Sequence, residues 1–158
     1  MHTTASIDTQ FPLTIYYDAS CRMCNAEMTN LMLRNDAGRL IFVDASSADL
    51  RDAPASKETL MHAIHGVAAD GTVYIGVECL TRAYLGIGWT WVPKLVNLPG
   101  MAIAARKLYL WIARHRYRLP QAPIVWVFER AMRRAAQRAA ARSAACADGM
   151  CDMDRPPH

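Results

Sequence analysis

Apolar residues in the first part of the chain are spaced first as in a strand and then as in a helix. Residues 11–17 are mostly β-branched and aromatic, which predicts a strand. Met28, Leu31 and Met32 then recur at spacings of three and four, as on one buried face of a helix. The short apolar run 40–44 predicts a second strand, central in the sheet and covered on both faces. Together these segments predict a strand-helix-strand unit.

A β-hairpin is predicted next. Residues 60–68 and 72–75 are strand-like, and the Asp-Gly pair between them signals a tight turn. His62 and His65 would point to opposite faces of the first hairpin strand, because their spacing is odd. Either histidine can therefore lie at a sheet edge or approach a functional site.

Helical periodicity returns after the hairpin. Residues 76–85 predict a helix, residues 86–100 a connector with two prolines, and residues 101–118 a longer helix. The inward side chains of this longer helix are predicted to be Leu108, Trp111 and Ile112. Near its end, Arg114 and Tyr117 are expected to cap and pack the helix.

The C-terminal part predicts one more helix, residues 124–146, with arginines on one half and a thin, alanine-rich stripe on the other. The arginines are Arg130, Arg133, Arg134, Arg138 and Arg142, and the stripe is Met132, Ala135, Ala136 and Ala139. Such a stripe packs on a helix better than it inserts into lipid, so we expect docking or self-association. Residues 147–158 lack periodicity and are expected to be disordered.

Charge is distributed unevenly along the chain. Residues 1–100 contain 7 Lys and Arg against 10 Asp and Glu, whereas residues 101–158 contain 11 against 4. A basic segment of this kind is typical of a solvated helix face, and it also suits an anionic partner.

The length of 158 residues suits one domain with an appended helix. No uninterrupted apolar run approaches the roughly 18 residues that span a bilayer, so no transmembrane segment is expected.

The N-terminus lacks the basic and apolar regions of a secretory signal, so a cytoplasmic location is expected. In that compartment a pair of cysteines is more often catalytic or metal-binding than structural.

The motif that carries chemistry is Asp18-x-x-Cys21-x-x-Cys24, at the turn between the first strand and the first helix. The helix N-terminus and Arg22 place positive charge beside Cys21, which favours its thiolate. Cys24 lies one helical turn away, close enough to form a disulfide after Cys21 has attacked a substrate sulfur. We expect Cys21 to be the more exposed and more acidic thiol. Asp18 can manage the proton of Cys24, or it can serve only as a helix cap.

The same spacing also occurs in metal sites, so different functions remain open. One is a thiol-disulfide oxidoreductase acting on a protein or small-molecule disulfide. No bound cofactor is expected, and the reductant is unidentified. Another is binding or transport of a soft metal, Cu(I) or Zn, by Cys21 and Cys24 with a histidine or Met23. A third is an interaction module whose basic helix binds an anionic partner while the dithiol senses redox state. Asp18 and Arg22 favour the first function, because neither is a soft ligand.

The Asp-Cys-Cys array after an aromatic strand resembles the DCC family of thiol-disulfide oxidoreductases, which takes its name from that pattern. The similarity covers roughly residues 13–119. Beyond the motif it is carried by residues 34–43, Asp70-Gly71, Gly76 and residues 112–119. Two positions depart from the family pattern: Ala19 stands where glycine is usual, and Cys79 stands where a small residue such as alanine is common.

The resemblance implies a thioredoxin-like fold, and the order of predicted elements agrees with it. We therefore predict an α/β protein: a thioredoxin-like mixed sheet with flanking helices, plus a C-terminal helical extension. The first two strands should be parallel and the hairpin antiparallel. The thioredoxin-like domain is expected at residues 11–119, followed by the basic amphipathic helix at 120–146 and the tail at 147–158.

Three cysteines lie outside the motif. Cys79 is expected to pack as a small apolar residue. Cys146 and Cys151 are separated by four residues that include a glycine, so a turn can bring their sulfurs within disulfide reach. This second pair can exchange electrons with Cys21 and Cys24, bind a soft metal, or have no role.

Overall fold

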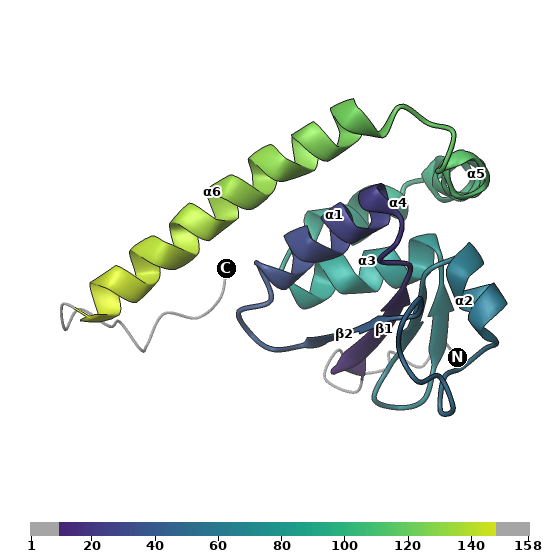
Figure 1. Ribbon diagram of the computed structural model, residues 1–158, viewed down its shortest axis with the longest axis horizontal. Helices are drawn as coiled ribbons and strands as arrows, with labels where there is room; N and C mark the ends of the chain where they lie inside the picture. Colours follow the sequence, from purple (N-terminus) through teal and green to yellow (C-terminus); the bar gives the residue numbers. More distant parts are fainter. Residues whose placement is uncertain (1–9, 148–158) are drawn as a thin grey trace.

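The structure is a computed structural model and describes residues 10–147. Its sheet contains β1 (Leu13–Tyr17), β2 (Leu40–Asp44), β3 (His65–Val67) and β4 (Val73–Ile75). The strand order is β2-β1-β3-β4; β1 and β2 run parallel, and the two remaining pairs are antiparallel. The prediction that residues 40–44 form a central strand covered on both faces is wrong, because β2 lies at the edge of the sheet and Ile41 is exposed. Helices flank this mixed sheet (Figure 1). The fold is therefore of the predicted α/β class and is consistent with a thioredoxin-like domain.

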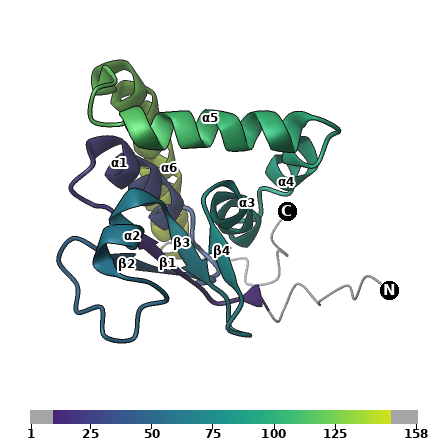
Figure 2. The ribbon, with the colours of Figure 1, turned by 90° about the vertical axis from the view of Figure 1, so that its right-hand side faces the viewer.

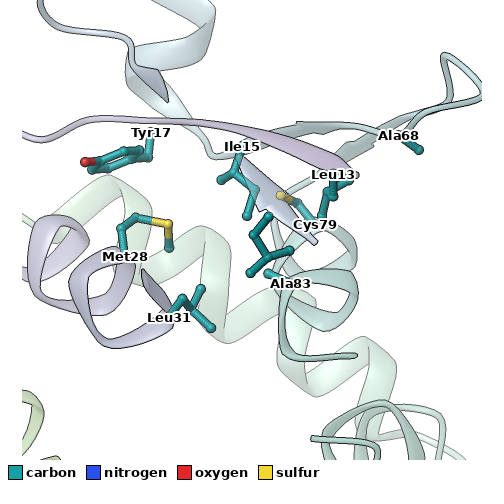
Figure 3. Packing of buried hydrophobic residues seen from close by; sticks show 9 residues of the cluster. Leu13, Ile15, Tyr17, Met28, Leu31, Ala68, Cys79 and Ala83 are labelled. Atoms are coloured by element: carbon teal, nitrogen blue, oxygen red, sulfur yellow. The ribbon is translucent and has the colours of Figure 1, made fainter. Parts of the chain in front are cut away.

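The central strand β1 anchors the hydrophobic core. Side chains alternate between the two sides of a strand, and Leu13, Ile15 and Tyr17 all lie on one buried face. The helices α1 (Arg22–Met32) and α3 (Val77–Gly86) cover that face (Figure 1). Figure 3 shows this cluster, which also contains Met28, Leu31, Leu40, Ala68, Cys79 and Ala83. The predicted packing of Cys79 as a small apolar residue is confirmed, since its side chain is completely buried in this cluster.

One part of the predicted hairpin is wrong. Residues 57–62 form the helix α2 (Lys57–His62), and strand β3 begins only at His65. Ser56 caps α2, because its hydroxyl accepts a hydrogen bond from the Thr59 amide at 3.4 Å. Leu60 is buried on this helix. A serine N-cap followed by a single apolar anchor is a short helix signal that the strand prediction overlooked.

The two histidines consequently lie on different elements. His62 is exposed at the end of α2. His65 is buried in β3, where its Nδ1 lies 2.8 Å from the carbonyl oxygen of Ala63. The prediction that both occupy one strand, on opposite faces, is therefore wrong. His65 has a hydrogen-bond partner in its own backbone segment.

Two helices follow α3: α4 (Trp91–Val96), within the predicted connector, and α5 (Met101–His115). Helix α5 lies across the top of the molecule in Figure 2, above α1 and α3. It turns only a narrow side toward the domain. On that side the Tyr109 hydroxyl accepts a hydrogen bond from the Ile64 amide at 3.1 Å.

The predicted inward face of α5 is only partly right. Ile112 is partly buried, but Leu108 is 58% exposed and Trp111 is also exposed. The physical reason is that α5 is anchored by the hydroxyl of Tyr109, which occupies the position facing the domain. Apolar periodicity alone cannot choose between neighbouring stripes of a helix that is apolar on several sides.

The last helix, α6 (Gln121–Ala147), runs along α1 (Figure 1). Val125 and Ala135 are buried on this helix, and Arg34 donates a hydrogen bond to the carbonyl oxygen of Ala131 at 3.3 Å. Of the predicted apolar stripe, Ala135 is buried and Met132 is partly buried, whereas Ala136 is exposed and the side chain of Ala139 lies outside the described part of the chain. Arg130, Arg133, Arg134 and Arg138 are exposed, and the side chain of Arg142 lies outside the described part of the chain. Binding of an anionic partner and self-association through this helix stay predictions.

Across residues 10–147, no helix has both the length and the apolarity needed to cross a bilayer. The predicted tail lies outside the described residues from position 148 onward, together with Cys151. The side chain of Cys146 is also outside the described part of the chain.

Two leucine substitutions test this arrangement of helices. Leu31→Ala in α1 should lower the free energy of unfolding by about 2–5 kcal/mol, because Leu31 is completely buried in the core. Leu108→Ala in α5 makes the same chemical change in another helix, and it should cost less than about 0.5 kcal/mol because Leu108 is exposed. Urea denaturation of both variants measures the difference, and equal losses would contradict the observed orientation of α5.

Candidate active site

The Asp-Cys-Cys motif spans the turn between β1, which ends at Tyr17, and α1, which begins at Arg22. Cys21 is the N-cap residue of α1, and its sulfur accepts a hydrogen bond from the Cys24 amide at 3.4 Å. At the other end of the turn, the backbone carbonyl of Asp18 accepts a hydrogen bond from the Cys21 amide, also at 3.4 Å. The turn therefore holds the carboxylate and both thiols close to the start of one helix.

The departure from the family pattern at Ala19 does not strain this turn. No non-glycine residue in the described part of the chain has a positive φ angle, so this position does not require glycine. The Ala19 amide donates a hydrogen bond to Asp44 Oδ1 at 3.2 Å. The end of β2 thereby supports the turn that carries the motif.

The two thiols interact with each other, and their acidities differ. The pKa of Cys21 is lowered to about 6, chiefly by a hydrogen bond from Cys24 and also by the charge of Arg116, against the opposing effect of burial. The same hydrogen bond, together with burial and the negative charge of Cys21, raises the pKa of Cys24. At neutral pH the pair therefore carries its negative charge on Cys21, in agreement with the expected order of acidity.

The expected order of exposure is wrong. Cys21 is only 1% exposed, whereas Cys24 is partly exposed. The side chain of an N-cap residue folds back over the helix start, and here the sulfur of Cys21 meets the Cys24 amide. The N-cap position therefore gives the sulfur of Cys21 a hydrogen bond from the Cys24 amide but does not place it in solvent.

Asp18 is 2% exposed and is surrounded by hydrogen-bond donors. Ser20 donates to Oδ1 from its amide at 3.0 Å and from its hydroxyl at 2.5 Å. The Tyr117 hydroxyl donates to Oδ2, and a guanidinium nitrogen of Arg116 lies 3.3 Å from the same oxygen. Burial alone would raise the pKa of Asp18, but these hydrogen bonds and the Arg116 charge hold it below its usual value. The side chain is thus an ionised member of a buried network, while Cys21 caps the helix.

Arg116 is the buried cation of the site. It is 7% exposed, donates a hydrogen bond to the Met61 carbonyl, and lies 4.9 Å from the centre of the Tyr117 ring. Its charge acts to lower the pKa of both Cys21 and Cys24. Arg22, which was expected to support the thiolate, is exposed. The end of α5 therefore supplies the cation that acts on the thiols.

A cavity of about 410 Å³ borders Cys24. Apolar side chains from several helices form most of its wall, among them Met23, Met28, Leu60, Leu80, Ile112 and Phe128. Asp18 and Arg116 also line the cavity, but Cys21, His62 and His65 are not among its lining residues. A concave, mostly apolar site with a few polar groups is the usual form of a small-molecule site.

A second polar pair lines the same cavity. The Tyr84 hydroxyl donates a hydrogen bond to Glu27, and both side chains contribute to the wall. Burial raises the pKa of Glu27, even though the Tyr84 hydrogen bond and the Arg34 charge act against it. The environment of Glu27 therefore favours the neutral acid more than a surface position would.

Sequence reasoning placed Arg116 among the cations near a helix end and did not assign it to the site. Tyr117 was expected only to cap and pack the helix, yet it donates a hydrogen bond to Asp18. The available signal was the position of the Arg116-Tyr117 pair inside the family-like segment 112–119. Local spacing could not show that this segment returns to the motif.

Within residues 10–147, no three His, Cys, Asp or Glu side chains form a group that could hold a metal ion. Met23 and Cys24 line the same cavity. A soft metal at this site would therefore depend on the two cysteines and on Met23.

Comparison with known proteins is consistent with this site. An uncharacterized chloroplastic protein of Arabidopsis thaliana is 31% identical over 117 residues, which are 72% of this chain and 55% of that protein. The chain thus spans about half the length of this curated relative. No solved structure matches the chain. Residues 15–122 match the family of DCC1-like thiol-disulfide oxidoreductases. Because that match covers most of the chain, including the motif cysteines and Arg116, the protein belongs to the DCC1-like thiol-disulfide oxidoreductase family.

Proposed function

We propose that the protein exchanges disulfides with Cys21 as the attacking thiolate, Cys24 as the resolving thiol and Asp18 as a proton acceptor. The general reaction class follows from the family. The observation that supports these residue roles is the hydrogen-bonded thiol pair, in which the pKa of Cys21 is lowered beside the buried cation Arg116. A thiolate is the nucleophile in such exchange, and lowering its pKa makes it available at neutral pH.

The reaction has two exchange steps. The Cys21 thiolate attacks one sulfur of the substrate disulfide; a bond forms to that sulfur, the substrate S–S bond breaks, and the other sulfur leaves as a thiolate. Cys24 then attacks Cys21, and the second substrate thiolate leaves. The substrate gains two electrons, and the protein loses two electrons as Cys21 and Cys24 form a disulfide. A thiol reductant restores the dithiol by the same steps in reverse.

The second step requires Cys24 to lose its proton. The main causes of its raised pKa are the hydrogen bond to Cys21 and burial, followed by the negative charge of Cys21. Once Cys21 is bonded to substrate, the hydrogen bond to its thiolate and its charge are gone, and the charge of Arg116 favours the Cys24 thiolate. Asp18 lines the same cavity as Cys24 and is ionised, so it can receive the proton at a carboxylate oxygen.

The cavity supports a substrate with an apolar group next to its disulfide. Cys24 lies on the cavity wall, and the sulfur of Cys21 accepts a hydrogen bond from the Cys24 amide, so the cavity adjoins the dithiol. Its wall is mostly apolar, and its charged groups are Asp18, Glu27 and Arg116. A small disulfide, or a protein disulfide flanked by apolar side chains, fits this chemistry.

Trapping the intermediate tests the roles of the two cysteines. Reduced Cys24→Ser protein mixed with bis(2-hydroxyethyl) disulfide should stop as a mixed disulfide on Cys21, because the resolving thiol is absent. Intact mass and peptide mapping detect that adduct, whereas the unsubstituted protein should lose two hydrogens without retaining an adduct. Cys21→Ser is the matched control and should react far more slowly at neutral pH. Preferential adduct formation on Cys24 would reverse the roles, and a stoichiometric metal protecting both thiols would favour the soft-metal function.

Replacing Asp18 tests proton transfer. Asp18→Asn should slow the resolving step by about tenfold or more, the usual strength of general base catalysis. Removing a negative charge near the thiols should by itself lower the pKa of Cys21, since Asp18 acts to raise it. A slower reaction together with a more acidic Cys21 would therefore identify proton transfer. Unchanged or faster exchange, measured by stopped flow with the melting temperature as a control, would leave Asp18 only a structural role.

The pH dependence of the thiolate tests Arg116. Thiolate absorbance should rise as pH increases through about 6, which is well below the roughly 8.5 of an ordinary cysteine. Arg116→Gln removes a stabilising positive charge, so the transition should move to higher pH. Arg22→Gln is the matched control, because Arg22 is exposed, and it should leave the transition in place. A larger shift with Arg22→Gln would restore the role first expected of that residue.

A further inference from the structure

Helix α5 contacts the domain through a narrow stripe. Ala105, Tyr109 and Ile112 are partly buried, and they recur at spacings of four and three on one side of the helix. Most of the remaining residues of α5 are exposed. Figure 2 shows the helix lying along the outside of the molecule over its whole length. The helix is therefore a surface element with a wide solvent-facing side.

The solvent-facing side of α5 is apolar and cationic at once. Ile103, Leu110 and Trp111 are each more than half exposed there. Lys107 and Arg114 are exposed on the same side, opposite the buried stripe. We call these five residues the outer face of α5. Single exposed apolar residues are normal, but three large ones on one helical face form a patch that is typical of an interaction site.

The surrounding sequence contains no acidic residue to balance these charges. Between Glu78 and Glu129 there is no Asp or Glu. The same stretch contains Arg82, Lys94, Arg106, Lys107, Arg114, Arg116 and Arg118. Arg106 pairs with Glu78 and Arg116 with Asp18, and neither of these pairs involves the outer face. The outer face thus presents positive charge without a neighbouring carboxylate from its own helix or from the adjoining loops.

We propose that the outer face of α5 docks on an anionic lipid bilayer, with the helix lying in the plane of the membrane surface. The helix is about 22 Å long, so its apolar side chains can enter the headgroup boundary together. Tryptophan is favoured at that boundary, and the long stems of Lys107 and Arg114 allow their charges to reach lipid phosphates. This binding is peripheral and does not require a helix that crosses the membrane.

Charge complementarity favours lipid over a second copy of the chain. If two outer faces packed on each other about a two-fold axis, Lys107 and Arg114 of both copies would come together without carboxylates between them. Anionic headgroups instead supply the missing negative charge. The inner stripe of the same helix includes Tyr109 and Ile112, which line the cavity beside Cys24. Docking by the outer face therefore leaves the cavity wall unchanged and places it within about one helix diameter of the lipid.

Vesicle sedimentation tests the proposal with the full chain. The protein should sediment with vesicles of phosphatidylcholine mixed with phosphatidylglycerol, and much less with phosphatidylcholine alone. Lys107→Glu with Arg114→Glu should weaken binding by about tenfold or more, since one cation at an anionic surface contributes roughly fivefold. Leu110→Ser with Trp111→Ser should weaken it by a comparable factor. None of these residues lines the cavity, so disulfide exchange by each variant should be unchanged.

Two matched controls locate the binding surface. Ile41→Ser with Val73→Ser removes exposed apolar residues from the sheet, and Arg134→Glu with Arg138→Glu makes the same charge change on α6. Both should retain vesicle binding. Equal loss in either control, or no binding to anionic vesicles by the unsubstituted chain, would overturn the proposal. A dimer seen by light scattering and abolished only by the outer-face variants, without vesicle binding, would identify a second copy instead. Because binding is measured without a disulfide substrate, failure here leaves the proposed exchange reaction unaffected.

Discussion

The ion pair between Asp18 and Arg116, with the hydrogen bond from Tyr117, is the interaction on which the site depends. A buried carboxylate requires a compensating charge and hydrogen bonds, because transfer from water without them is costly. Here the compensation comes from the end of α5, while the carboxylate follows the central strand β1. The pairing therefore ties the cysteine turn to a helix that is distant in sequence. Together with the hydrogen bond between the Ile64 amide and the Tyr109 hydroxyl, it favours one side of α5 facing the cavity.

The same cation links the architecture to the chemistry. Arg116 compensates the negative charge of Asp18 and acts to lower the pKa of both thiols. A change at the Asp18 carboxylate therefore alters the electrostatic field at Cys21 and Cys24. A low local dielectric strengthens each of these interactions compared with their strength in water. The hydrogen bond between the thiols lowers the pKa of Cys21 and raises that of Cys24, so one thiol is acidified while the other remains protonated. Arg116, brought in from the end of α5, acts to lower the pKa of both thiols.

Local patterns predicted the elements whose sequence signals are strong. The alternation in β1, the periodicity of α1 and the continuous apolar run of β2 gave the correct order and the parallel pairing. Weaker segments were predicted less well. Residues 60–62 of the predicted strand belong instead to the short capped helix α2, because Ser56 capping and burial of Leu60 outweighed the strand-like composition. On α5, Leu108 and Trp111 were assigned inward because hydrophobicity was the only local criterion, whereas the hydrogen bond of Tyr109 selects another side.

The sequence by itself determined the chemistry-bearing motif, the strand-to-helix turn that carries it, the fold class and the family, because each depends on residues that are close together in the chain. Only the tertiary structure decided which cation acts on the thiols, which thiol is enclosed, and what lines the space beside Cys24. These properties depend on contacts between β1, α1 and the end of α5, and local spacing contains no information about such contacts. Arg22 was the nearest cation in sequence, but Arg116 is the one that the fold buries beside Asp18.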